Sequence, residues 1–595
     1  VTVDWSTPVG VETYRTTTTI QVVSNAILSR SSLCTNVTDN AWKALADLDA
    51  DLIRYVPWFP MPVYGVANLN GTSDGWDFTF LAEMLDDFMN ATYARNHTTV
   101  INFSTQPAWL YADPPPAATR DPLATDFGYP PRTGLLDPTG KDLALYYGRL
   151  ASWMTKGQFV DDKGVVHTGG RHYNLTHWEV FNEPVGCHGM TGSEYTAQYD
   201  AVVEAIRNNV PEYLNVKFMG LAIAGIHVQP NLDWFSTFLN HSNHKPGVPL
   251  DYISFHHYGK PTSRTDPSTY PGMFDSVQDL SSLFQTISAM RDELSPSTKI
   301  SIDEVGVILP DDNSPSAPQP PASYWPAAGA FFAAVFSQLS VLGVDILGQS
   351  QLAGNPVLPE CGITDSQFPG VSLLDYNTGV GNAKYWVSKL LQESFSAGNT
   401  VVKTTISSGS SAFFCGEVDG HNGYGNLSLT CSDPTAVISA IDFAAFGTPT
   451  GTCGSYAVDS HCNAANTTAV VTAACKGKNS CTVPSFPTFG DPCFGVFKRL
   501  VVQAECSAGN GHASPPAADT HDFAQAFTRG STHSLLYVNG DDAPKSVTLA
   551  PWPAGASATV LTVDEASGNG APRRATLKSA AFTATPFSTN VIVWA

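Results

Sequence analysis

The amino-acid sequence predicts an α/β protein in which a (β/α)8 barrel is followed by a C-terminal β-sandwich, with a disulfide-rich module inserted into the sandwich. Over the first 395 of the 595 residues, short apolar strand-like runs alternate with longer amphipathic helical patterns. This alternation is typical of repeated βα units. After Ser394 the helical patterns end and short β-type runs follow, and eight of the 11 cysteines fall within residues 415–506.

The barrel prediction rests on the number of units. Eight candidate strands lie at residues 19–23, 52–56, 100–103, 178–181, 217–222, 252–255, 299–302 and 346–352. Helical patterns between and after them include residues 78–95, 142–155, 193–208, 232–240, 274–294, 325–342 and 383–394. We therefore assign residues 1–395 to a closed barrel, which places its chemistry on the loops after the carboxyl ends of the strands.

The β-rich remainder divides into two modules. The cysteine-rich module spans residues 413–507 and is followed by a Gly/Ala/Pro/Ser-rich stretch, residues 507–519, that reads as a linker. Residues 513–595 alternate as strands of a small sandwich. The isolated run 400–405 precedes the cysteines, so we expect residues 396–412 to belong to the same sandwich, and the first dozen residues to add a strand.

The charge balance excludes several classes of partner. The chain has 53 acidic and 31 basic residues, a formal net charge of −22. Such a chain repels nucleic acid and anionic membrane surfaces. Because the sequence shows no uncharged apolar run of about 18 residues, we also expect no membrane insertion.

Sequons and cysteines indicate an oxidising, secretory route. The chain starts at Val1 without a basic or apolar leader, which suggests a mature secreted form. Nine N-x-Ser/Thr tripeptides occur, and Asn102, inside an apolar run, is expected to be buried without a glycan. The dense cysteines indicate a disulfide-stapled module, and the expected location is extracellular, in the cell wall or matrix. The expected glycosylation sites are Asn36, Asn70, Asn90, Asn96, Asn174, Asn240, Asn426 and Asn466.

Two glutamates lie where a barrel presents catalytic groups. Glu183 ends the run 177–184, an apolar strand that terminates in Asn-Glu-Pro at the fourth candidate strand. Glu304 follows the seventh candidate strand. Strands four and seven face each other across the barrel mouth, so the two carboxyl groups meet there. Such a pair satisfies glycoside hydrolysis, which needs one protonated acid and one ionised carboxylate.

These residues resemble the clan of (β/α)8 glycoside hydrolases that carry their two glutamates after strands four and seven. The nearest likeness is to glycoside hydrolase family 39, which includes β-xylosidases and α-L-iduronidases. It rests on residues 178–184, on the following Tyr195-x-x-x-Tyr199 helix and on the C-terminal sandwich. The resemblance implies that Glu183 is the acid/base and Glu304 the nucleophile of a retaining enzyme, whose carboxyl groups lie about 5–5.5 Å apart.

The resemblance also assigns residues around the nucleophile. Arg54 on the second strand matches an arginine that the clan keeps beneath the nucleophile; alternatively it is a structural arginine paired with Asp49 or Asp51. His256 and Tyr258 alternate onto one face of the sixth strand, where the family places a histidine and a tyrosine. The other interpretation of His256 is a core histidine.

The sugar itself needs polar and aromatic contacts. Asn182 is expected to bind the hydroxyl next to the reacting carbon. Trp58 and Trp109 are candidate stacking residues, with packing as the alternative. The clan often has a Trp at the end of strand eight, whereas this chain has Leu-Gly-Gln-Ser-Gln-Leu. Gln349 or Gln351 is expected to take the polar part of that role, and the substrate stays unassigned.

Other catalytic chemistries are not indicated. Although the pairs His256-His257 and Cys187-His188 offer ligand atoms, no H-E-x-x-H, paired C-x-x-C or Asp-rich calcium loop accompanies them. A G-x-S-x-G elbow is also lacking. We therefore expect no metal and no cofactor.

The cysteine-rich module resembles the galactose/rhamnose-binding lectin domain of the sea-urchin-egg type, which also ends many plant β-galactosidases. The likeness rests on residues 444–453, 475–481 and 491–498. It implies that Lys498 and the displaced Glu417 contact a sugar, although Phe-Gly-Thr at 446–448 replaces the Tyr-Gly-Arg of the animal lectins. A purely structural module is the alternative. The implied bridges are Cys415–Cys453, Cys431–Cys506, Cys462–Cys493 and Cys475–Cys481.

One further bridge follows from the barrel itself. Cys34 follows strand one and Cys361 follows strand eight, and these strands are neighbours in a closed barrel, so we expect them to pair. The whole sequence then predicts a secreted retaining O-glycoside hydrolase that acts on extracellular or cell-wall glycans and has a glycan ligand for its lectin-like domain. The alternative is a catalytically silent glycan-binding matrix or cell-surface glycoprotein with the barrel as a scaffold, but the presence of both glutamates favours activity.

Overall fold

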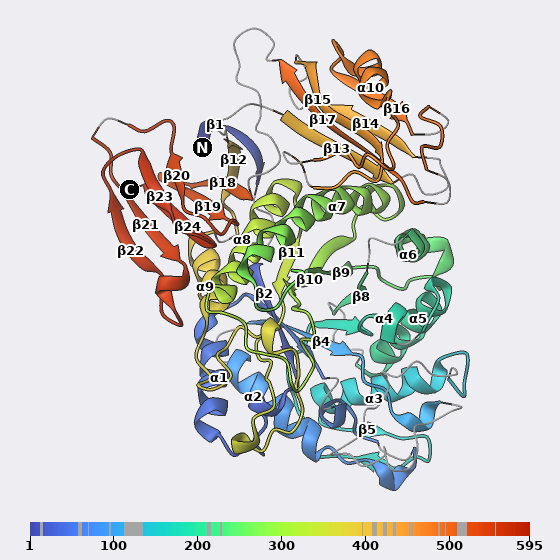
Figure 1. Cartoon of the computed structure of the whole chain (residues 1–595). Helices are drawn as coiled ribbons and strands as arrows, with labels where there is room; N and C mark the ends of the chain where they lie inside the picture. Colours follow the sequence, from blue (N-terminus) through green and yellow to red (C-terminus); the bar gives the residue numbers. More distant parts are fainter. Residues whose placement is uncertain are drawn as a thin grey trace.

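The computed structural model describes most of the chain and shows a barrel, a C-terminal pair of sheets and a separate β module (Figure 1). The described residues are 1–595 without 12–15, 58–61, 69–70, 94–96, 112–134, 188, 211–215, 226–228, 396, 407–412, 420–424, 432–435, 452, 454–455, 486–487, 494–495, 508–520, 554 and 595.

Eight parallel strands form the closed barrel that the sequence predicts. In chain order they are β2 (Thr16–Val23), β3 (Leu52–Val56), β4 (Thr98–Phe103), β7 (His177–Val180), β8 (Lys217–Ile223), β9 (Tyr252–Gly259), β10 (Lys299–Val307) and β11 (Ile346–Gln349), and β11 pairs with β2 to close the ring. The strands β9 and β10 run several residues past their predicted ends. These extensions continue the ladder, with Glu304 opposite His256.

Helices cover the barrel; those from α2 to α9 lie at the predicted places except the short α4, which, like α1, was not among the helices named from the sequence. They are α1 (Thr35–Leu48), α2 (Thr79–Tyr93), α3 (Lys141–Lys156), the short α4 (Pro184–Cys187), α5 (Gly192–Asn209), α6 (Gln229–Leu239), α7 (Asp275–Leu294), α8 (Tyr324–Leu342) and α9 (Ala383–Ser394). A small hairpin, β5 (Phe159–Val160) with β6 (Val166–His167), lies between α3 and β7. The start of α5 is fixed by a capping box between Thr191 and Glu194.

Helix α8 corrects one expectation. It is long and apolar enough to cross a membrane by length and composition, although the sequence was expected to contain no such run. Most of it, 78% of the apolar window, is buried inside the protein. It contacts β10 of the barrel on one side and β18, β19 and β24 of the C-terminal sheet on another. A helix enclosed from two sides needs apolar residues around most of its circumference.

A seven-stranded sheet lies beside the barrel, and its C-terminal strands are red in Figure 1. Its order is β1 (Thr2–Val11), β12 (Thr400–Thr405), β18 (Asp522–Arg529), β19 (Thr532–Asn539), β24 (Ser588–Trp594), β21 (Ala558–Val563) and β22 (Arg573–Leu577). The pair β20 (Lys545–Thr548) and β23 (Ala581–Ala584) shares a core with it. As predicted, the run 400–405 and the first residues join this sheet.

The cysteine-rich module sits between β12 and β18 in the chain, and these two strands are neighbours in the sheet. It contains the sheet β13 (Phe413–Asp419), β17 (Arg499–Ser507) and β15 (Val437–Gly447), the pair β14 (Asn426–Thr430) and β16 (Ser480–Pro484), and helix α10 (Thr467–Cys475). It has its own hydrophobic core. The module is therefore an insertion into the sandwich.

Five disulfides join the same cysteines that the sequence analysis pairs. Cys34, at the start of α1, is bonded to Cys361 and ties the two ends of the barrel across 327 residues. The other four lie within the inserted module, and they are Cys415–Cys453, Cys431–Cys506, Cys462–Cys493 and Cys475–Cys481.

Candidate active site

The structure brings Glu183 and Glu304 into one cavity at the barrel mouth. Glu183 lies just beyond β7 and Glu304 lies in β10. One oxygen of each carboxylate and one ring nitrogen of His256 all lie within 4.8 Å of one another. This closeness matches the separation of about 5–5.5 Å in retaining glycosidases rather than the roughly 6.5–9.5 Å of inverting ones.

The backbone around Glu183 adopts a conformation that non-glycine residues rarely take. Phe181 has φ 65° and Glu183 has φ 49°, both in the left-handed region. Two hydrogen bonds hold this turn, because the Glu183 N–H donates to the carbonyl of Ala222 and the Asn102 amide donates to the carbonyl of Phe181. Local strain held by its surroundings in this way is common at functional sites.

A bulge in β10 directs two successive acidic side chains inward. The register with β9 shifts between Ile302 and Glu304, which leaves Asp303 as the extra residue. As a result both acidic side chains reach Arg54, with Glu304 Oε1 2.6 Å from Nη1 and Asp303 Oδ2 3.1 Å from Nε. In a regular strand they would point to opposite faces.

Donors surround the Glu304 carboxylate. Its Oε1 accepts hydrogen bonds from Arg54 Nη1 at 2.6 Å and from Gln21 Nε2 at 2.5 Å, and its Oε2 accepts from the Tyr258 hydroxyl at 2.7 Å. The Tyr258 hydroxyl also contacts Ser350 Oγ at 2.8 Å. Donors on both oxygens stabilise the negative charge that a nucleophilic carboxylate needs.

Arg54 is the centre of the buried charge network. Its Nε donates to Glu179 at 2.5 Å and its Nη2 donates to the Asn182 amide oxygen at 2.6 Å. Burial disfavours the charged guanidinium, but the carboxylates of Glu179, Asp303 and Glu304 outweigh it and raise the pKa of Arg54 well above its ordinary value. The alternative pairing with Asp49 or Asp51 is therefore wrong, because Arg54 points into the barrel.

A second layer of polar residues lies beneath the two glutamates. Glu179 also accepts from Ser254 Oγ at 2.7 Å and Asn102 Nδ2 at 2.8 Å. Burial raises the pKa of Glu179, but the charge of Arg54 prevails and holds it below its usual value. Burial, and then the charge of Glu179, raise the pKa of Asp303 well above its usual range.

His256 lies between the two glutamates. Its Nδ1 is 2.9 Å from Glu183 Oε1 and 3.3 Å from Glu304 Oε2, and its Nε2 is 3.6 Å from Asp303 Oδ1. Burial lowers the pKa of His256, but the carboxylates of Glu304, Glu183 and Asp303 outweigh it and raise the pKa to about 9. A charged imidazolium has no lone pair for a metal ion, so at neutral pH this trio suits hydrogen bonding rather than metal binding.

Only some of the residues that the sequence predicts for the site line this cavity. Its lining residues are Gln21, Glu183, Tyr258, Glu304, Ile308, Gln351, Phe368 and Val371. Gln349 lies in β11 and its side chain accepts a hydrogen bond from Ser388 on α9, outside the barrel. The expectation for Gln349 is therefore wrong. Its alternative Gln351 lines the cavity and lies two residues beyond the end of β11, where strand alternation no longer applies.

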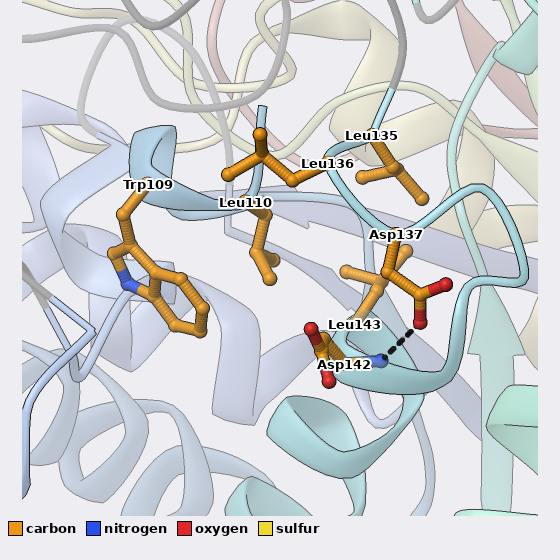
Figure 2. A pocket seen from close by; sticks show the side chains of 7 residues that line it. All are labelled: Trp109, Leu110, Leu135, Leu136, Asp137, Asp142 and Leu143. Carbon is orange, nitrogen blue, oxygen red and sulfur yellow. Dashed lines mark hydrogen bonds between the residues drawn. The ribbon is translucent and has the colours of Figure 1, made fainter. Parts of the chain in front are cut away.

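The two tryptophans proposed for stacking do not line this cavity among the described residues. Trp58 lies outside them. Trp109, on the short helix η4 (Ala108–Leu110), donates its indole N–H to the carbonyl of Asn68 at 2.9 Å. Its ring lines a separate pocket, shown in Figure 2, with Leu110, Leu135, Leu136, Asp137, Asp142 and Leu143. Besides Tyr258, the described lining residues of the cavity at the barrel mouth include one more aromatic ring, that of Phe368, which the sequence analysis missed.

In the inserted module, the two proposed sugar contacts bind different neighbours. Glu417 is 3.1 Å from Arg499 Nη1, and Lys498 is 2.7 Å from Asp491. Glu417 lies on β13 and keeps an exposed side chain, whereas that of Lys498 is 12% exposed. Phe446, which replaces a tyrosine of the animal lectins, is buried.

The sequons differ in exposure. Asn102 is fully buried and its amide donates two hydrogen bonds, so it has no room for a glycan. Asn240 is half-buried, and Asn70 and Asn96 lie outside the described residues. The exposed sequon asparagines are Asn36, Asn90, Asn174, Asn426 and Asn466.

Comparison with protein families supports both modules. Residues 162–394 match glycosyl hydrolases family 39, and residues 429–506 match the D-galactoside/L-rhamnose binding SUEL lectin domain. Among curated proteins, the chain is 51% identical over 82 residues to beta-galactosidase 8 of Arabidopsis thaliana and 52% identical over 82 residues to beta-galactosidase 6 of Oryza sativa subsp. japonica. These matches cover 14% of this chain and 10% and 9% of the relatives, so the chain spans about a tenth of their length.

Solved structures share the overall fold. An arabinofuranosidase crystal structure covers 100% of this chain and 99% of its own at 13% identity, with a TM-score of 0.54. A family 51 α-L-arabinofuranosidase from Bifidobacterium longum covers 99% and 97% at 13% identity, with a TM-score of 0.53. At such identity the likeness concerns the fold alone, and it extends over barrel and sandwich together.

Proposed function

Since the barrel is of the glycosyl hydrolase family 39 type and the inserted module is a SUEL-type lectin domain, we propose that this chain is a retaining O-glycoside hydrolase. In this proposal Glu304 is the nucleophile and Glu183 the acid/base. The observation that carries it is the approach of the two carboxylates within 4.8 Å at the mouth of a closed barrel. A water molecule between the carboxylate and the sugar, as inverting enzymes need, requires a wider gap.

In the first step, an oxygen of Glu304 attacks the anomeric carbon and forms a glycosyl ester. The bond between that carbon and the glycosidic oxygen breaks, and Glu183 gives its proton to the departing oxygen. In the second step, Glu183 takes a proton from water, the water oxygen bonds to the anomeric carbon, and the ester bond to Glu304 breaks. Two inversions leave the anomeric configuration unchanged.

The surrounding charges suit these roles. Arg54 and Gln21 hold one oxygen of Glu304 from below, which leaves Oε2, bonded to Tyr258, toward the cavity. The His256 imidazolium beside both glutamates offsets their charge when both are ionised. Such preorganised donors stabilise a changing charge without reorganisation during the reaction.

The lectin module extends the proposal to location and binding. We infer that it binds a glycan through the surface that holds Glu417 and Lys498, and that the protein is secreted and acts on extracellular or cell-wall glycans. Support comes from the five disulfides, which persist in oxidising compartments. The exposed sequons are compatible with the same route.

Chemical rescue tests the proposed roles directly. Aryl xylosides, galactosides, glucosides, arabinosides and iduronides are offered to the wild type and to Glu304→Ala. We expect the wild type to hydrolyse at least one of them and Glu304→Ala to lose this activity. Azide, entering from the side of the missing carboxylate, should then restore turnover and give a glycosyl azide of inverted configuration. With Glu183→Ala, azide should instead give the retained product.

The matched control is Glu293→Ala, which removes an exposed glutamate on α7 and should leave turnover unchanged. Retained azide product from Glu304→Ala would overturn the assignment of the nucleophile. If the wild type hydrolyses none of the glycosides, the catalytically silent glycan-binding scaffold is favoured instead.

A further inference from the structure

Apart from its two glutamates, the described lining of the catalytic cavity is uncharged. Besides Glu183 and Glu304, its lining consists of three neutral polar and three apolar side chains, namely Gln21, Tyr258 and Gln351, and Ile308, Phe368 and Val371. Among the described lining residues none carries a positive charge. The described lining residues therefore offer hydrogen bonds and an apolar surface, and no counter-ion for an acidic sugar.

The two cations nearest to the cavity are already engaged. Arg54 lies beneath it, fully buried, with its donors directed at Glu179, Glu304 and Asn182. The His256 ring is fully enclosed and lies between Glu183 and Glu304. Either cation would have to leave a carboxylate to bind a negatively charged ligand, and an unpaired buried carboxylate is costly.

Among the described residues, the aromatic rings that line the cavity are those of Tyr258 and Phe368. Phe368 is half-buried, lies in the long connection between β11 and α9, and has φ 38° in the left-handed region. Its N–H donates to the Asn313 side chain at 2.8 Å. This backbone conformation is unusual for a phenylalanine and is held by a neighbouring loop.

A buried ionic clamp fixes the segment that follows Phe368. The Gly370 N–H donates to Asp312 Oδ1 at 3.1 Å, and the Gly370 carbonyl accepts from Tyr324 at 2.7 Å and from Lys384 at 3.1 Å. Asp312 is itself paired with Arg264 at 2.7 Å. A Cβ at Gly370 would come within 2.8 Å of the Asp312 carboxylate. The segment that contains Phe368 and Gly370 is thus held by hydrogen bonds to three other segments, and its position is fixed before a ligand binds.

We propose that Phe368 forms the surface on which the sugar ring lies, and that this cavity selects neutral sugars over uronic acids. The inference rests on the proposed function and adds the substrate class. The C–H face of a sugar ring packs on an aromatic face, and Phe368 lines the same cavity as the two glutamates. A uronic acid would bring a carboxylate beside Glu304 without a cation to balance it.

Matched substrate pairs test the charge selection. Aryl glucoside and glucuronide, and aryl galactoside and galacturonide, differ only in the oxidation state of C6. For the pair whose neutral member is hydrolysed, we expect kcat/KM to favour the neutral sugar by about 100-fold or more, because an unpaired buried charge costs several kcal/mol. A uronide turned over as fast as its neutral partner would overturn the proposal, while leaving the retaining mechanism intact.

Variants at Phe368 test the stacking. Phe368→Leu keeps an apolar side chain without the ring and should lower kcat/KM roughly 2- to 10-fold through KM, as expected for one lost aromatic contact. Phe368→Tyr should stay near the wild type. The control Phe497→Leu changes a phenylalanine of the inserted module that is 68% exposed, and it should have no effect. An unchanged KM in Phe368→Leu, with an unchanged melting temperature, would refute the stacking role.

A binding experiment distinguishes a failure of the neutral-sugar proposal from a failure of the proposed hydrolase function. Equilibrium binding of galactose and galacturonic acid is measured by calorimetry for the full-length wild type and for Phe368→Leu, since the variant leaves the lectin module intact. If Phe368→Leu removes a component of galactose binding, this supports Phe368 as the sugar-binding surface even when no glycoside is hydrolysed. If the variant loses binding of galacturonic acid instead, the charge selection is wrong.

Discussion

The side-chain amide of Asn102 donates a 2.8 Å hydrogen bond to the buried carboxylate of Glu179. The same nitrogen donates to the carbonyl of Phe181 at 2.7 Å and so also holds the turn that leads to Glu183. A residue inside a glycosylation tripeptide therefore supports the catalytic strand. Its conformation is determined by the barrel interior, where no sugar chain fits.

We expect Asn102 to carry no glycan and Asn102→Ala to lower the free energy of unfolding by about 1–3 kcal/mol, because a buried carboxylate oxygen loses its donor. Glycopeptide mass spectrometry and urea denaturation check the two parts. The control Asn36→Gln, at an exposed sequon on α1, should change stability by less than about 0.5 kcal/mol. A glycan found on Asn102 in folded protein would contradict the structure.

Arg54→Met keeps much of the side-chain volume but removes the charge that Glu179 and Glu304 face. We expect it to lower the free energy of unfolding by about 3–5 kcal/mol, since it leaves buried carboxylates without their partner. Arg54→Lys should recover only part, because an ammonium cannot reproduce the fork of donors. Adding Glu179→Gln to Arg54→Met should restore some stability. Urea denaturation measures these proteins together with Glu179→Gln alone, and additive effects in the double variant would contradict the pairing.

The pKa of His256 makes stability depend on pH in a defined range. Its folded pKa is about 9, above the ordinary 6.5, because Glu304, Glu183 and Asp303 surround it. The stability that the imidazolium contributes is complete below pH 6.5 and is lost as the pH rises through 9. The difference in the free energy of unfolding between wild type and His256→Asn should therefore shrink between these values. If the free energies of unfolding of the wild type and His256→Asn, measured by urea denaturation, change with pH in parallel, His256 does not titrate in this range.

The bond between Cys34 and Cys361 closes a far longer loop than any other disulfide of the described chain, with a sequence separation of 327. In the loop-entropy account, constraining the unfolded chain then stabilises by about 6 kcal/mol. The matched comparison is Cys475–Cys481, with a separation of 6, for which the same argument gives about 2 kcal/mol. Double-alanine variants of each pair, compared by thermal unfolding, should follow this order. The reverse order would show that native-state contacts decide instead.

The sequence predicts what depends on local pattern and on strand order. The eight barrel strands appear where apolar runs mark them, and the residues that follow strand ends, such as Glu183, meet across the mouth because the closed barrel brings them there. The approach of the cysteines Cys34 and Cys361 follows from the same closure. These inferences require only the strand order of the closed barrel.

Other parts of the site depend on which way a side chain turns, and local pattern does not determine this. Gln21 and Asp303 lie inside strands, and only the register and the bulge of β10 show that they reach the glutamate site. Gln349 is predicted to face the sugar, but its side chain accepts a hydrogen bond from Ser388 on α9 instead. Phe368 lies in an irregular connection far from any strand end, where no periodic signal indicates that its ring returns to the cavity.

The lectin-type module leaves the sandwich after β12 and re-enters it at β18, and these strands are hydrogen-bonded neighbours. Such an insertion is anchored at two adjacent points, so it cannot swivel as freely as a domain hung on one linker. If the module binds a glycan as proposed, its attachment to the same chain raises the effective concentration of that glycan at the cavity. On the proposed function, a glycan with several cleavable bonds would then be cut repeatedly before it is released.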